Sequence, residues 1–283
     1  MRAAKPPASG DQAISALLRG VTWLEVAVLV IAGGGLLIAH PLVVGIWPWP
    51  LAPFNLRFLG ALYTAALLAA LLQAWIGRWA PARMVTTMIF VFTLVVTVTS
   101  FHHGARFDPA KAAVWVWFVL YIGVCVNAGA HLWWYRRVPA AGAPPGGRSR
   151  AALLAQSLAF GGYGVALLLL PETAAQIWPW QLDAFHAQLY SVAFLAPAAG
   201  ALALLRSATR VDWLALGITQ SAWGVLPILA LVIVDRKLHR VDWEAGPVWL
   251  WAGLFATLAA MGFWMLWQEA RAGRRVDVPG EQS

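Results

Sequence analysis

Residues 112–135 read AAVWVWFVLYIGVCVNAGAHLWWY, a run of 24 residues without aspartate, glutamate, lysine or arginine. A membrane-spanning helix needs about 20 predominantly apolar residues. Seven further runs of this kind lie at residues 26–47, 58–77, 84–101, 151–171, 187–205, 213–234 and 246–267. The strands of a membrane barrel are only about 10 residues long and alternate between apolar and polar residues. The sequence therefore predicts an all-α integral membrane protein with eight transmembrane helices.

The composition of the whole chain agrees with this fold class. Of the 283 residues, 61% are hydrophobic and 11% are charged, whereas a soluble domain has roughly 45–50% apolar and about 25% charged residues. A water-soluble enzyme and an intrinsically disordered protein are therefore excluded. The single cysteine, Cys125, also excludes an intramolecular disulfide and a cysteine-based metal cluster.

The basic residues predict how the chain crosses the membrane. Eight spans place both termini on one side, and 14 of the 20 lysine and arginine residues then fall on that side. Because cytoplasmic loops carry an excess of basic residues, we expect a multi-pass protein of the cell (inner) membrane with both termini in the cytoplasm. This topology accounts for the net charge of +8. The expected partner is the lipid bilayer, with a membrane-protein partner or a homo-oligomer as further alternatives, and not nucleic acid.

Two segments of the chain match each other closely. Residues 46–54 read IWPWPLAPF and residues 177–185 read IWPWQLDAF, with six of nine positions identical at an offset of 131. The same offset pairs Arg19 with Arg150, and an offset of 134 pairs Asp108 with Asp242. These matches predict a tandem parallel repeat of two four-helix bundles, residues 19–137 and 150–271. A cytoplasmic N-terminal segment (1–18), a flexible cytoplasmic linker (138–149) and a cytoplasmic tail (272–283) complete the predicted organisation.

The matching segments hold four candidate ligand-binding tryptophans: Trp47, Trp49, Trp178 and Trp180. Each pair follows the first span of its copy, where proline ends a helix and tryptophan favours the membrane interface. One interpretation is a rigid interfacial turn that anchors the span. The alternative is a tryptophan-lined mouth for an apolar ligand.

Glu25 and Gln156 are the other two ligand-binding candidates. They occupy matching places at the edge of the predicted first span of each copy, and an acid inside a membrane helix is a functional candidate by default. The alternative is that Glu25 stays in the cytoplasmic interface near Arg19. No predicted span carries a charged residue near its centre, which argues against an ion-coupled pump.

Side chains expected on the outer face give weaker candidates for chemistry. Imidazole and carboxylate groups suit zinc and similar ions, and the weak metal candidates are His40, His102 and His103. The weak catalytic candidates are Asp108, Asp242 and Glu244. Haem with two histidine ligands would need His40 beside His102 or His103. Because no pair of these residues has the spacing of one helical turn, no metal, haem or other cofactor is predicted.

Three functions remain open at this point. The first is a non-enzymatic subunit, scaffold or binder of lipid or apolar ligands. It is favoured by the many tryptophans and by an expected outer face on which six acidic residues, Asp183 among them, balance six basic residues, Arg106 among them. The second is a transporter or channel for a small neutral or hydrophobic molecule, which a parallel repeat favours. The third is an intramembrane enzyme whose site lies at the outer interface.

Overall fold

The computed structural model describes residues 12–276, and side chains within this range except that of His40 and those beyond residue 271. The predicted fold class is confirmed: the described chain contains eight helices that are long and apolar enough to cross a membrane. The first span, Ala16–Leu37, is built from α1 (Ala16–Leu29), a π-helical segment (Val30–Gly34) and α2 (Gly35–Leu37). The sixth is built from α9 (Ala184–Tyr190) and α10 (Val192–Leu204). The other six are single helices: α4 (Pro53–Ile76), α5 (Trp79–His102), α6 (Ala112–Trp134), α7 (Gly147–Leu169), α11 (Arg210–Leu238) and α12 (Gly246–Val276).

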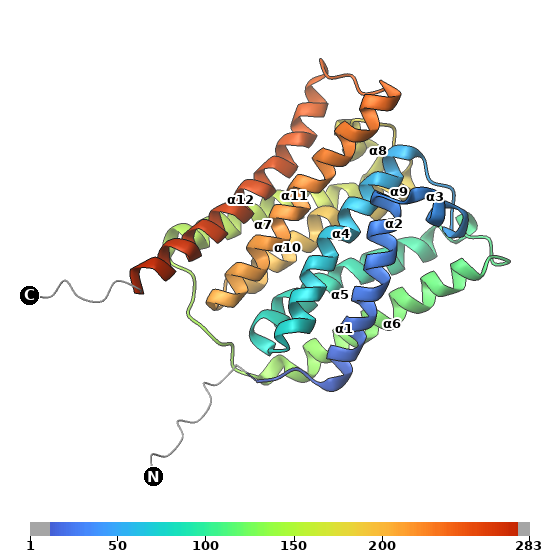
Figure 1. The fold of residues 1–283 in the computed structure, drawn as a ribbon. Coiled ribbons are helices and arrows are strands. Elements are labelled where there is room, and N and C mark those ends of the chain that lie inside the picture. Colours follow the sequence, from blue (N-terminus) through green and yellow to red (C-terminus); the bar gives the residue numbers. More distant parts are fainter. Residues whose placement is uncertain (1–11, 277–283) are drawn as a thin grey trace, which may run out of the picture.

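Two pairs of short helical turns lie at one end of the bundle (Figure 1). They are α3 (His40–Val43) with a 3-10 turn (Val44–Ile46), and α8 (Pro171–Ala174) with a 3-10 turn (Ala175–Ile177). Each precedes one of the two matching segments. We call this end of the bundle the tryptophan end. The opposite end, at which α1 begins and α12 ends, is called the terminal end.

The first span begins ten residues earlier than the sequence predicted. The helix starts at Ala16, where the Ser15 side chain accepts a hydrogen bond from the backbone N–H of Leu18. The helix continues through the charged Arg19, because the guanidinium group donates a hydrogen bond to the carbonyl of Ala74 at 3.0 Å. Glu25 therefore lies near the middle of this span and not at its edge. The expectation that no span carries a charged residue near its centre is wrong.

The helices of the two predicted copies pack against one another. The helix α4 contacts α1 of its own copy and α11 of the other, and Figure 1 shows α4 between these two. In the same way α10 contacts α7 of its own copy and α5 of the other. The remaining large contacts are α5 with α6 and α11 with α12. A twofold relation between residues 19–137 and 150–271 would produce this pattern, and the duplication itself stays a prediction.

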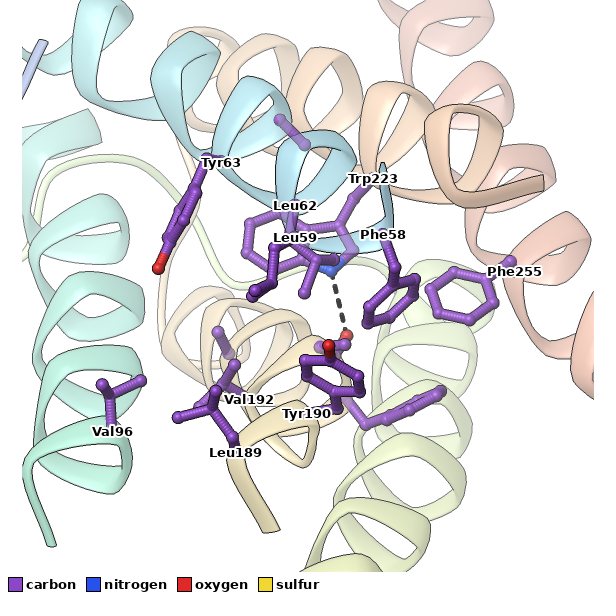
Figure 2. Packing of buried hydrophobic residues seen from close by; sticks show 14 of the residues in the cluster. Phe58, Leu59, Leu62, Tyr63, Val96, Leu189, Tyr190, Val192, Trp223 and Phe255 are labelled. Carbon is purple, nitrogen blue, oxygen red and sulfur yellow. Dashed lines mark hydrogen bonds between the residues drawn. The ribbon is translucent and has the colours of Figure 1, made fainter. Parts of the chain in front are cut away.

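Buried aromatic side chains fill the centre of the bundle between these helices. Phe58 of α4, Tyr190 of α9 and Phe255 of α12 meet there, with ring centroids 4.7 Å apart for Phe58 and Tyr190 and 5.9 Å apart for Phe58 and Phe255 (Figure 2). The indole N–H of Trp223 on α11 donates to the carbonyl of Ala193 at 3.0 Å, which satisfies a polar group inside the core. This packing fixes α4, the helix that carries several of the residues described next.

Candidate functional site

The two matching segments, residues 46–54 and 177–185, are called the tryptophan turns. Their first tryptophans have the same backbone conformation, and the tryptophan side chains point into the bundle. Trp47 (φ −75°, ψ 143°) and Trp178 (φ −77°, ψ 140°) are both extended residues that follow a 3-10 turn. Trp47, Trp49 and Trp178 are less than a tenth exposed, and Trp180 is half-buried. These side chains therefore pack inside the protein and not on its rim.

Reciprocal hydrogen bonds tie the two turns together. The indole N–H of Trp49 donates to Nε2 of His186 at 3.3 Å, and that of Trp180 donates to Oδ1 of Asn55 at 2.8 Å. The donors are 131 residues apart in the sequence, and so are the acceptors. Each turn is thus anchored on the helix that follows the other turn, so Trp49 and Trp180 link the two halves.

A chain of polar side chains continues from His186 to the surface. Because Nε2 of His186 accepts from Trp49, its Nδ1 carries the proton and donates to Oδ1 of Asp183 at 2.8 Å. The other carboxylate oxygen of Asp183 pairs with the Arg106 guanidinium at 2.7 Å. This chain of residues was not identified from the sequence. The offset of 131 that pairs Asn55 with His186 was the available signal.

The electrostatics of Asp183 follow from these contacts. Partial burial by itself would raise the pKa of Asp183, but the hydrogen bonds from His186 and the charges of His186 and Arg106 outweigh it and hold the pKa below its ordinary value. A carboxyl whose pKa is lowered on folding stabilises the protein at pH values above its unfolded pKa, which is about 3.9 for aspartate. That stabilisation is lost as the pH falls through the lower folded value.

We expect Asp183→Asn to lower the melting temperature at neutral pH and to have less effect as the pH falls below about 4. Asparagine still accepts the backbone N–H bond that starts α9, so the change isolates the charge. Because the side chain is 40% exposed, solvent screening limits the effect to below about 1 kcal/mol. Thermal unfolding of both proteins in detergent from pH 3 to 8 measures it. A difference that stays constant over this range would contradict the role given to the charge.

A cavity of about 490 Å³ lies between α1, α4, α5 and α6. At the terminal end, α1 and α6 are joined by a hydrogen bond of 2.7 Å between Oγ of Ser15 and Nε2 of His131. Farther toward the tryptophan end, residues of both helices line the cavity, and so do Ile46, Trp47 and Pro48. Its rim includes Leu24 and Ile31, which are 54% and 64% exposed on the outside of the bundle. Apolar side chains on the outside of the first span therefore border the cavity.

Four aromatic residues form one wall of the cavity, which we call the aromatic wall: Trp47, Tyr63, Trp117 and Tyr121. The ring centroids of Trp47 lie 6.1 Å from Tyr63 and 5.9 Å from Trp117. The hydroxyls of Tyr63 and Tyr121 are hydrogen-bonded to each other at 2.8 Å. Figure 2 shows Tyr63 pointing away from the Phe58 cluster. The rest of the lining is mostly aliphatic.

Two polar groups at the cavity have no partner among the described residues. The carboxyl of Glu25 lines the cavity, and it makes no hydrogen bond or ion pair within residues 12–276. The indole N–H of Trp47 is buried and likewise lacks an acceptor in that range. Two of the six predicted ligand-binding residues, Trp47 and Glu25, therefore meet at one cavity.

At the matching sequence positions of the second half stand larger, aromatic side chains. The offset of 131 pairs Leu29 with Phe160 and Ala32 with Tyr163. The rings of Phe160 and Tyr163 pack on Phe194 with centroid distances of 6.0 and 4.7 Å. The first half therefore carries smaller side chains at these two positions, and both Leu29 and Ala32 line the cavity.

Tyr163 also gives Trp178 a hydrogen-bond acceptor, which Trp47, at the matching position of the first half, lacks. The indole N–H of Trp178 donates to the Tyr163 hydroxyl at 3.0 Å, and that hydroxyl donates to the carbonyl of Ala174 at 3.0 Å. Ala32, which lines the cavity, stands at the matching position of the first half. Gln156, which matches Glu25, is buried, and its amide has no partner in the described part of the chain. The sequence missed Ala32 because a single alanine in an apolar helix carries no signal by itself.

The remaining candidates lie in local turns. Asp108 accepts the backbone N–H of Ala110 at 3.0 Å just before α6, and Asp242 accepts that of Glu244 at 3.1 Å just before α12. His103 is hydrogen-bonded to Gln188 at 2.6 Å, and its ring contacts that of His102. Across the described residues, no three His, Cys, Asp or Glu side chains gather in a way that could hold a metal ion. The side chain of His40 lies outside the described part.

Comparisons of the chain with protein-family models, with curated proteins and with solved structures found no match.

Proposed function

We propose that this membrane protein is a non-enzymatic binder of a lipid-like, apolar molecule that enters the cavity between α1 and α6 from the bilayer. The observation that carries the proposal is the cavity itself. Its volume of about 490 Å³ falls within the roughly 300–1,000 Å³ of ligand pockets. Its lining is almost entirely apolar, and exposed apolar residues of a candidate membrane span border it, which supports entry of the molecule from the lipid.

The second half of the chain supports a role for this space. There the same helices and the same tryptophan turn are packed with Phe160 and Tyr163. The framework can therefore be closed by two larger side chains, and an open space is a property of Leu29 and Ala32 in the first half. Protein interiors are otherwise close-packed, and a cavity of this size costs stability when nothing fills it. A resident molecule would offset that cost.

A transporter for a small hydrophobic molecule is the second candidate. The observation that favours it is the place of Glu25 near the middle of the first span. Ionisable residues inside the membrane commonly mark the path of a substrate or proton. A transporter moves the bound molecule between the two sides of a proteoliposome, whereas a binder only retains it. Flux of the molecule identified in the experiment below separates the two functions.

We expect the wild-type protein, extracted gently from its membranes, to retain a small molecule of defined mass in native mass spectrometry. Ala32→Tyr places a second-half side chain in the cavity and should reduce retention at least tenfold. The new hydroxyl can accept the Trp47 N–H, so the melting temperature should not fall. The matched control is Ala27→Tyr on the same helix, since Ala27 is exposed and does not line the cavity. Equal retention by the wild type and Ala32→Tyr would overturn the proposal.

A further inference from the structure

Glu25 lies deep in the membrane-spanning region. At about 1.5 Å per residue, it is about 14 Å from the start of α1 at Ala16 and about 18 Å from the end of the span at Leu37. Among the described residues that line the cavity, Glu25 is the one member of the Asp, Glu, Lys, Arg and His types. No basic side chain of the described helices therefore faces it across this space.

An unpaired carboxylate in apolar surroundings is costly unless an opposite charge or hydrogen-bond donors accompany it. Arg19, the nearest basic residue on the same helix, already donates to the carbonyl of Ala74 at the terminal end. The other helices around the cavity contribute only neutral side chains to its lining. Without a ligand such a carboxyl group takes up a proton and becomes neutral, so a cationic group that keeps it ionised has to be supplied by the ligand.

The aromatic wall lies at a similar depth. Tyr63 is about 15 Å from the start of α4, and Tyr121 is about 14 Å from the start of α6, both measured from the tryptophan end. These depths are within about one helical turn of that of Glu25. Aromatic faces attract cations, and tryptophan and tyrosine do so best when the cation is shielded from water. A cavity that combines a carboxyl group with two tyrosine rings at a similar depth, and with Trp47 and Trp117 nearer the tryptophan end, favours a positively charged ligand over a neutral or negative one.

We propose that the cavity binds a lipophilic organic cation, an amine or quaternary onium group carried on an apolar body, with its charge at Glu25 and the aromatic wall. This inference rests on the proposed binding function and specifies the charge of the ligand. The second half differs at the matching positions. An amide, Gln156, replaces the carboxyl, and Phe194 and Phe255 replace the tyrosines at offsets of 131 and 134. The first half therefore combines the cavity with an ionisable carboxyl group, and the matching position of the second half carries an amide.

Two ions of similar size and opposite charge test the inference. Tetraphenylphosphonium and tetraphenylborate are both apolar spheres of four phenyl groups. Equilibrium binding of each is measured on the full chain in nanodiscs of zwitterionic lipid, with protein-free nanodiscs subtracted. We expect the cation to bind at least tenfold more tightly than the anion. Glu25→Gln, which keeps the size of the side chain, should reduce binding of the cation at least tenfold.

The matched control is Glu172→Gln, which removes an exposed carboxylate in α8, outside the cavity. It should leave binding of the cation unchanged. Equal binding of the two ions, or full binding of the cation by Glu25→Gln, would overturn the inference. The proposed function is tested separately: a neutral molecule retained by the wild type and lost from Ala32→Tyr would leave that function standing. Retention that Ala32→Tyr does not change would remove both.

Discussion

Tyr163→Ala combined with Phe160→Leu is expected to lower the free energy of unfolding by about 3 kcal/mol and to give the second half a cavity like that of the first. Large-to-small changes in a protein core cost about 3–5 kcal/mol for an aromatic side chain. The lower value applies here because Tyr163 is only partly buried. The change also leaves the buried N–H of Trp178 without its acceptor, which adds to the loss.

Two measurements check this expectation. Thermal unfolding in detergent gives the stability loss, and native mass spectrometry shows whether the new space takes up a neutral apolar molecule, since Gln156 offers no carboxyl group to a cation there. The control Tyr163→Phe removes only the hydroxyl and should cost about 1 kcal/mol without creating space. A double variant as stable as the wild type would show that Phe160 and Tyr163 do not close the second half.

The sequence was sufficient for the fold class, and the reason is physical. A helix that crosses a bilayer must be long and apolar, so each span leaves a run that can be counted. Seven of the eight predicted runs overlap the observed helices over most of their length. The first predicted run, residues 26–47, lies ten residues beyond the observed start of the span, because the prediction ended each span at a charged residue. Arg19 and Glu25 lie inside that helix, and only the structure shows the carbonyl of Ala74 that receives Arg19.

The candidate site was predictable only in part. Trp47 and Glu25 were identified from their types and places, and both line the cavity. Trp49 and Trp180 were identified for the same reason, but their N–H groups are used in hydrogen bonds between the halves. Residue types alone could not distinguish a tryptophan that lines a cavity from one that links the two halves. The difference depends on whether another side chain accepts a hydrogen bond from the indole N–H.

The two halves differ at the cavity in the size of one pair of matching residues, and neither residue is a candidate site residue when it is considered alone. Ala32 and Tyr163 are at matching positions, and one leaves a space where the other fills it. Comparing the two halves position by position would have found this pair from the sequence. Whether an alanine leaves a cavity still depends on the angle between α1 and α6, which the sequence does not specify. The site therefore required the structure.

Gly262→Leu is expected to cost about 3 kcal/mol or more, or to prevent folding, because it forces two helices apart. A Cβ atom at Gly262 of α12 would lie 2.5 Å from the backbone N of Ser221 and 2.7 Å from the carbonyl of Gly217, both on α11. Backbone atoms cannot turn away as a side chain can, so the two helices would have to separate. Small residues allow this close approach of helices in membranes, and overpacking a core commonly costs about 1–3 kcal/mol even where side chains can adjust.

The same helix offers a matched control for this prediction. A Cβ atom at Gly253 would meet nothing within 4 Å, so Gly253→Leu should change stability by no more than about 0.5 kcal/mol. Thermal unfolding and the monodisperse fraction in gel filtration measure both variants in the same detergent. Since α11 also packs on α4, and α4 carries Tyr63 of the aromatic wall, Gly262→Leu should weaken ligand retention as well. If Gly262→Leu proved as stable as Gly253→Leu, α11 and α12 could not be packed at the distance that the structure gives them.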